Sequence, residues 1–122
     1  MLEATELERR KPVWKALSEF YLDTELQPSD CDHVARVLGS SGFTLTELKA
    51  IDRFEVFPVL INNLLSPTGF WTAFEEPWLH EKCVIACKKK NHALVRLKNF
   101  IVYSLFVGIM KKQWREIEKR IE

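Results

Sequence analysis

FIVYSLFVGIM, residues 100–110, is an apolar run that only Ser104 and Gly108 interrupt. A surface helix shows one apolar stripe, whereas a helix that is apolar all round is buried on every side. The run is also shorter than the roughly 20 residues that a membrane-spanning helix needs. We therefore expect this segment to lie in a helix at the centre of a water-soluble core.

The residues after the run keep a helical spacing on one face only. Hydrophobic side chains recur every three or four positions, at Tyr103, Val107, Met110, Trp114, Ile117 and Ile121. The positions between them are mostly Lys, Arg, Glu and Gln. We expect one long C-terminal helix over about residues 92–120, buried at its start and amphipathic at its end.

The earlier part of the chain predicts four more helices, over about residues 12–22, 28–38, 45–57 and 77–88. Pro28 suits a first helical turn, and Thr44 with Glu47 fits a capping box. Pro58 predicts a break or kink just before it. After it we expect a short helical turn and a loop that carries Phe70, Trp71 and Phe74. With no strand pattern, the sequence predicts an all-α, compact bundle of about five helices, as a single helical domain over residues 1–122.

Composition excludes several classes of protein. The chain has 122 residues, 47% of them hydrophobic, with four glycines and five prolines, which excludes a disordered protein. The first eleven residues, MLEATELERRK, are charged and hold no apolar segment of the kind found in a secretory signal. Three cysteines do not form the even set typical of a secreted disulfide framework. We expect a cytoplasmic protein.

Charge is distributed unevenly along the chain. Residues 1–81 hold 7 Lys and Arg against 14 Asp and Glu, whereas residues 82–122 hold 11 against 3. One alternative function is therefore that of a regulator that binds nucleic acid through the basic region 82–122. The simpler interpretation is that acidic early helices pack beside the basic late helix. The third helix carries Glu47, Asp52 and Glu55 and is too acidic for a DNA groove, so we do not favour nucleic acid as the partner.

A second alternative is a metal-dependent protein. His80, Cys83 and Cys87 share one face of a predicted helix, and both residue types bind zinc. Cys31, His33 or His92 would have to supply a fourth ligand. A structural zinc site usually shows paired short spacings, and here there is one cluster. We therefore predict no metal and no other cofactor, with two cysteines facing the core.

Catalytic motifs are lacking in the sequence. No serine lies in a Gly-x-Ser-x-Gly context, and no glycine-rich phosphate loop occurs. We therefore expect a protein that is not an enzyme.

Acidic and aromatic residues offer a surface for a partner protein. The candidates are Asp23, Glu25, Glu55, Trp71, Glu75, Glu76 and Trp78. Loop aromatics such as Trp71 and Trp78 either fold back as a lid or act as interface anchors. Glu55 lies between apolar residues, and if buried it needs a cationic partner, for which Arg36, Arg53 and Arg96 are candidates. Structural pairing is the favoured role for Glu55.

Several short motifs resemble those of a known family. They are Val13-Trp14-x-Ala16-Leu17-Ser18, Leu22-Asp23-Thr24-Glu25-Leu26, Asn63-Leu64-Leu65-Ser66 and Gly69-x-Trp71, within residues 12–80. In these the chain resembles small bacterial proteins known only as a domain of unknown function. The resemblance implies a bacterial cytoplasmic protein and assigns no catalytic residue.

The sequence thus favours a non-enzymatic protein-binding module. Its most specific form is a bacterial immunity protein that neutralises a cognate toxin, because clustered acids suit a basic toxin surface. The oligomeric state stays open, since the stripe Met110, Trp114, Ile117 and Ile121 can pack within one chain or between two.

Overall fold

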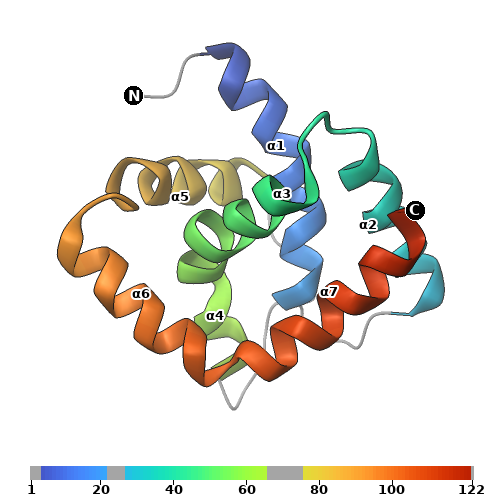
Figure 1. Ribbon diagram of the computed structural model, residues 1–122. Coiled ribbons are helices and arrows are strands. Elements are labelled where there is room, and N and C mark those ends of the chain that lie inside the picture. Colours follow the sequence, from blue (N-terminus) through green and yellow to red (C-terminus); the bar gives the residue numbers. More distant parts are fainter. Residues whose placement is uncertain (1–3, 22–26, 66–75, 122) are drawn as a thin grey trace.

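The protein is a bundle of helices. The computed structural model describes residues 4–21, 27–65 and 76–121, and for residues 62–65 it describes the backbone alone. Its elements are α1 (Ala4–Ser18), η1 (Glu19–Tyr21), α2 (Pro28–Gly39), α3 (Leu45–Ile51), η2 (Asp52–Val56), α4 (Phe57–Leu65), α5 (Glu76–Lys89), α6 (Ala93–Leu105) and α7 (Val107–Ile121). Because α3, the π-helical turn η2 and α4 follow without a break, the described chain forms six helices and no strand (Figure 1). The all-α prediction is confirmed.

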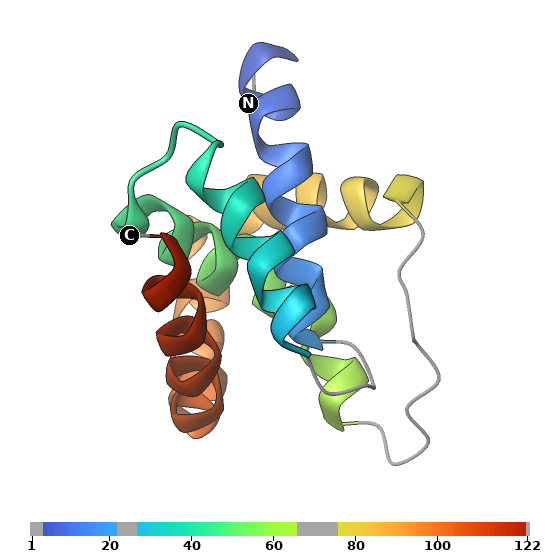
Figure 2. The same cartoon turned by 90° about the vertical axis from the view of Figure 1, so that its right-hand side faces the viewer.

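Helix α1 runs through the middle of the bundle. It packs against α2, α5 and η2, and α7 packs along α2. Figure 2 shows α1 and α2 side by side, with α5 and α7 on opposite sides of them. Helix α6 crosses the edge of the molecule and joins the end of α5 to the start of α7 (Figure 1).

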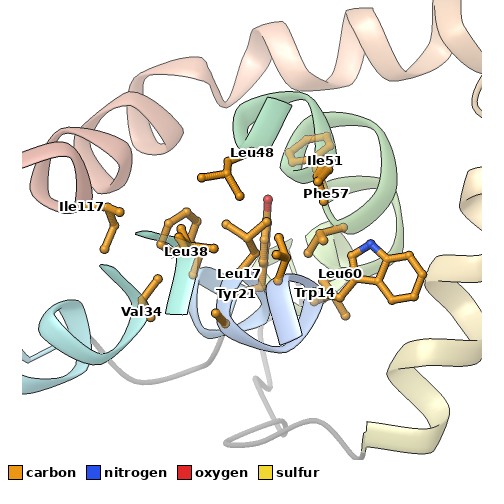
Figure 3. Packing of buried hydrophobic residues seen from close by; sticks show 14 of the residues in the cluster. Trp14, Leu17, Tyr21, Val34, Leu38, Leu48, Ile51, Phe57, Leu60 and Ile117 are labelled. Carbon is orange, nitrogen blue, oxygen red and sulfur yellow. The ribbon is translucent and has the colours of Figure 1, made fainter. Parts of the chain in front are cut away.

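The hydrophobic core lies between α1, α2, α3, α4 and α7. Figure 3 shows Leu17 and Tyr21 of α1 and η1 among Leu38, Leu48 and Phe57 of the surrounding elements. All five side chains are almost completely buried. Leu38 follows Val34 by four residues and Leu48 precedes Ile51 by three, a helical spacing that groups each pair on one inward face.

Helix α1 extends beyond its predicted start. It passes through Pro12 and includes residues from Ala4 onward, whereas the sequence favoured a start at Pro12. A proline inside a helix removes one backbone hydrogen bond. Ion pairs from Glu6 to Arg9 and Arg10, three and four residues away, support the turns before the proline.

The sequence predicted a break or kink before Pro58, and the structure has a π-helical turn there. Proline has no N–H to donate, and its ring crowds the carbonyl four residues earlier, which here belongs to Phe54. The chain stays helical through Pro58, with η2 directly before α4. At the other end of this helical run Thr44 and Glu47 form the expected capping box, in which the Glu47 N–H donates to Thr44 Oγ1 at 3.1 Å.

The sequence predicted a long, buried C-terminal helix, and this prediction is wrong in two respects. The chain bends by 78° between α6 and α7, with Phe106 between them. The apolar run is also largely exposed: Phe100, Ile101, Leu105 and Ile109 all face solvent. A run that is apolar all round carries no information on which side faces the core, and Gly108 in the first turn of α7 lowers helix propensity beside the bend. The amphipathic part was predicted correctly, since Met110, Trp114 and Ile117 are buried.

Two Leu→Ala substitutions test this correction. Leu17→Ala removes a fully buried side chain, and we expect it to lower the free energy of unfolding by about 2–5 kcal/mol. Leu105→Ala removes an exposed side chain and should change that free energy by less than about 0.5 kcal/mol. Urea denaturation measures both. Equal losses would show that the residue 100–110 segment is buried after all.

Candidate functional site

The turn η2 places two carboxylates inside the protein. Glu55 is 1% exposed and accepts hydrogen bonds from three side chains. Trp14 Nε1 donates to Glu55 Oε1 at 2.9 Å, while Arg10 and Lys90 donate to Oε2 at 2.6 and 2.8 Å. The predicted structural pairing of Glu55 is confirmed, but its cations are Arg10 and Lys90 instead of Arg36, Arg53 or Arg96. Its carboxylate has no surface to offer a partner.

The second carboxylate, Asp52, has neutral donors. It is 0% exposed. Tyr21 Oη donates to Asp52 Oδ1 at 2.7 Å, and Trp114 Nε1 donates to Oδ2 at 3.0 Å. Met110 Sδ lies 3.5 Å from the same Tyr21 hydroxyl. Protonated Asp52 can therefore donate to the Tyr21 oxygen while that hydroxyl turns toward Met110.

The two carboxylates differ in acidity because their surroundings differ. Burial raises the pKa of Asp52 to about 6, and the hydrogen bonds from Tyr21 and Trp114 offset only part of that effect. Burial also raises the pKa of Glu55, but hydrogen bonds from Lys90 and Trp14 and the charges of Lys90 and Arg10 outweigh it and leave the pKa below its usual value. Glu55 thus stays ionised in its ion pairs with Arg10 and Lys90, whereas Asp52 is the carboxylate that titrates near neutral pH.

A cavity of about 270 Å³ opens beside Glu55. Arg10, Lys90 and Arg96 line it together with Glu47 and Glu55. Arg10 and Lys90 already bind Glu55, so most of the charge in this cavity is compensated within the protein. These contacts serve to hold the bundle together.

Helix α6 presents an unusual distribution of side chains. Leu94, Leu97, Phe100, Ile101 and Leu105 are between 54% and 75% exposed. Asn99 on the opposite side of the helix is buried, and its amide donates to the carbonyl of Arg53 in η2 at 2.9 Å. An extended apolar patch of this kind marks an interaction site on soluble proteins. We call these five residues the α6 face.

The structure describes two of the six other predicted partner-binding residues, Glu76 and Trp78. Glu76 is exposed at the start of α5, and Trp78 is partly buried two residues later. Asp23, Glu25, Trp71 and Glu75 lie outside the described residues, as do Phe70 and Phe74. The predicted acidic surface is therefore placed only at Glu76.

The predicted thiol and histidine cluster lies mostly in the core. Cys83 and Cys87 are buried on α5, and the His80 ring lies 6.3 Å from that of Trp14. Within residues 4–21, 27–65 and 76–121, no three His, Cys, Asp or Glu side chains are arranged to hold a metal ion. Burial raises the pKa of both thiols, that of Cys87 to about 12. A thiolate nucleophile is thus disfavoured at neutral pH.

The apolar composition of α6 and α7 also bears on membranes. No single helix in the described part of the chain is long and apolar enough to cross a bilayer. Taken together, α6 and α7 meet that criterion by length and composition, with the 78° bend between them.

Comparison with protein families identifies the family of this chain. A family model described as a domain of unknown function, DUF7079, matches residues 8–120. The chain belongs to the DUF7079 family. No curated protein and no solved structure gives a significant match to this DUF7079 protein. This match confirms the resemblance to a domain of unknown function. It also extends beyond residues 12–80, where the motifs quoted from the sequence lie.

Sequence reasoning missed the α6 face. Leu94, Leu97, Ile101 and Leu105 recur at helical spacing, which groups them on one side of α6. The signal that could have identified the outer side is Asn99, a polar residue on the opposite side of α6 from them. A buried asparagine needs a hydrogen-bond partner, and the π-helical turn supplies one.

Stability should depend on pH through Asp52. Its pKa is raised in the folded protein, so the stabilising effect of its proton is complete below about pH 4 and is lost as pH rises through about 6. Between pH 4 and 7 the DUF7079 protein should lose roughly 2 kcal/mol of unfolding free energy relative to Asp52→Asn. Urea denaturation at several pH values measures the difference. A constant difference between the two proteins would refute the shifted pKa.

The Glu55 ion pairs predict a matched pair of substitutions. Glu55→Gln leaves the cations of Arg10 and Lys90 without their carboxylate, and we expect a loss of about 3 kcal/mol in unfolding free energy. Glu8→Gln removes an exposed carboxylate that binds Lys11 at 2.8 Å, and the denaturation midpoint should barely move. Similar effects of the two substitutions would contradict the structural role of Glu55.

Proposed function

We propose that this DUF7079 protein is a non-enzymatic protein-binding module of the bacterial cytoplasm, and that the α6 face is its binding surface. The observation that carries the proposal is the orientation of α6. Its hydrophobic residues Leu94, Leu97, Ile101 and Leu105 face solvent while Asn99 faces the core. An isolated exposed leucine needs no explanation, but a continuous stripe on one helix does.

Removal of this stripe from water favours association with a partner. Burial of apolar surface contributes about 25 cal/mol per Å², and large aliphatic and aromatic side chains supply most of that area at protein interfaces. Helix α6 lies at the edge of the molecule (Figure 1), and the side chains of the α6 face are exposed there. Helix α6 is also held at its middle by Asn99, so the face is formed before binding.

The most specific form of the proposal is a bacterial immunity protein that neutralises a cognate toxin. Support for it is the exposed apolar α6 face, a surface of the kind that a stable protein complex covers. The acidic residues 1–81, which suggested a basic toxin from the sequence, lie outside that face. Co-expression with the product of the neighbouring gene tests it. Restored growth of cells that make a toxic neighbour supports immunity, and unrelieved toxicity contradicts it.

Charged substitutions on the α6 face test the binding surface. Leu97→Asp combined with Leu105→Asp puts two carboxylates on the α6 face and should lower partner recovery at least about tenfold. Leu45→Asp, also an exposed leucine, lies on α3 and serves as the matched control. Tagged proteins recovered from the native host are compared by quantitative mass spectrometry. A partner retained by the double variant, or lost by Leu45→Asp as well, would contradict the assignment of the surface.

A further inference from the structure

A groove runs beside the α6 face. Its volume is about 570 Å³, and it lies between α3 with η2 on one side and α6 with α7 on the other. Four cationic side chains line it, Lys49, Arg53, Lys111 and Arg115, against the single carboxylate of Glu118. The groove therefore carries a positive charge that one acid cannot compensate.

Within residues 4–21, 27–65 and 76–121, three of the four cations of the groove have no carboxylate partner. Lys49 forms an ion pair with Glu118. Among the described residues, Arg53, Lys111 and Arg115 form no ion pair. The Nε atom of Arg53 is buried and lacks a hydrogen-bond partner in that same part of the chain. A buried N–H of this kind costs free energy unless a ligand accepts its hydrogen bond.

Aromatic rings hold the Arg53 guanidinium in place. Its central carbon lies 4.8 Å from the centre of the Tyr103 ring and 5.5 Å from that of Phe100. Tyr103 lines the groove, while Phe100 belongs to the α6 face. The guanidinium thus lies where the groove meets that face, and its fork geometry suits a carboxylate.

The groove adjoins the α6 face along one edge, at Phe100, whose ring lies 5.5 Å from the guanidinium of Arg53 in the groove. Val107 lines the groove and is itself exposed at the bend beside Leu105. The sequence reinforces the charge of this region, because residues 82–115 hold nine Lys and Arg and no Asp or Glu. Every charged side chain that a partner meets along residues 82–115 is therefore positive, apart from the histidine at position 92.

We propose that this surface binds an acidic amphipathic helix of the partner protein. The apolar side of that helix covers Leu97 and Phe100, at the edge of the α6 face beside the groove, and its carboxylates enter the groove to bind Arg53, Lys111 and Arg115. This inference rests on the proposed function and specifies the chemistry of the partner. Helix-in-groove recognition combines apolar anchors at three- and four-residue spacing with charges at the edge, which matches the two parts of this surface.

Charge and shape favour this occupant over three others. A second copy would bring the same basic groove against itself, and like charges at an interface disfavour association. A bilayer surface covers a convex face but does not fill a groove that holds Arg53 at its edge. Nucleic acid supplies phosphates for the cations and no apolar stripe for Leu97 and Leu105.

Site-specific photo-crosslinking in the native host tests the proposal. A photoreactive amino acid replaces Val107 at the groove, and a second protein carries it at Leu97 on the α6 face. The crosslinked segment is identified by mass spectrometry. At Val107 it should be rich in Asp and Glu, with apolar residues every three or four positions.

Charge reversal supplies the control. Lys111→Glu with Arg115→Glu should lower the adduct yield at Val107 at least about tenfold. Lys88→Glu with Lys89→Glu makes the same charge change at the exposed end of α5 and should leave the yield within about twofold. Both variants should keep the wild-type urea midpoint, because the described structure shows no ion pair for any of the four side chains.

The possible outcomes distinguish this inference from the proposed function. An acidic segment whose capture depends on Lys111 and Arg115 supports the inference. A basic or neutral segment, a second copy of this chain, a lipid or a nucleic acid at Val107 overturns it, as does equal sensitivity to both charge reversals. An adduct at Leu97 without one at Val107 overturns the groove assignment alone. No adduct at either position contradicts the proposed function itself.

Discussion

The arrangement of this bundle depends on the burial of two carboxylates in one π-helical turn. Burial of an ionised carboxylate costs several kcal/mol unless donors are placed around it. The donors to Asp52 and Glu55 come from other parts of the chain: Trp14 in α1, Lys90 after α5 and Trp114 in α7. The positions of three helices are therefore coupled to η2 by hydrogen bonds as well as by apolar contacts.

This coupling determines how α6 lies. The helix spans the chain between Lys90 and Trp114, both of which are bound to η2, and Asn99 binds the Arg53 carbonyl of the same turn. With both ends and the middle fixed, the side of α6 that carries Leu97 and Leu105 faces outward. Exposure of an apolar stripe is thus a consequence of where the polar groups of η2 lie, and it leaves a surface that a partner can cover.

Local features of the fold could be predicted from the sequence, and long-range ones could not. The capping box at Thr44 and the start of α2 at Pro28 depend on neighbouring residues, and both were predicted correctly. The break or kink predicted before Pro58 is instead a π-helical turn through which the chain stays helical. The cations of Glu55 lie 45 and 35 residues away, at Arg10 and Lys90, and no local pattern indicates them. Periodicity groups residues on one face of a helix but does not show which face points inward, so the α6 face was missed.

A double-mutant cycle between Asp52 and Trp114 tests the central claim most directly. Asp52→Leu and Trp114→Phe are made singly and together, and urea denaturation gives the free energy of unfolding of each protein. If the buried carboxylate holds α7 on η2, the two effects should differ from additivity by more than about 1 kcal/mol, because residues in direct contact are energetically coupled. Strictly additive effects would show that Asp52 and Trp114 do not interact, and would contradict this account of the fold.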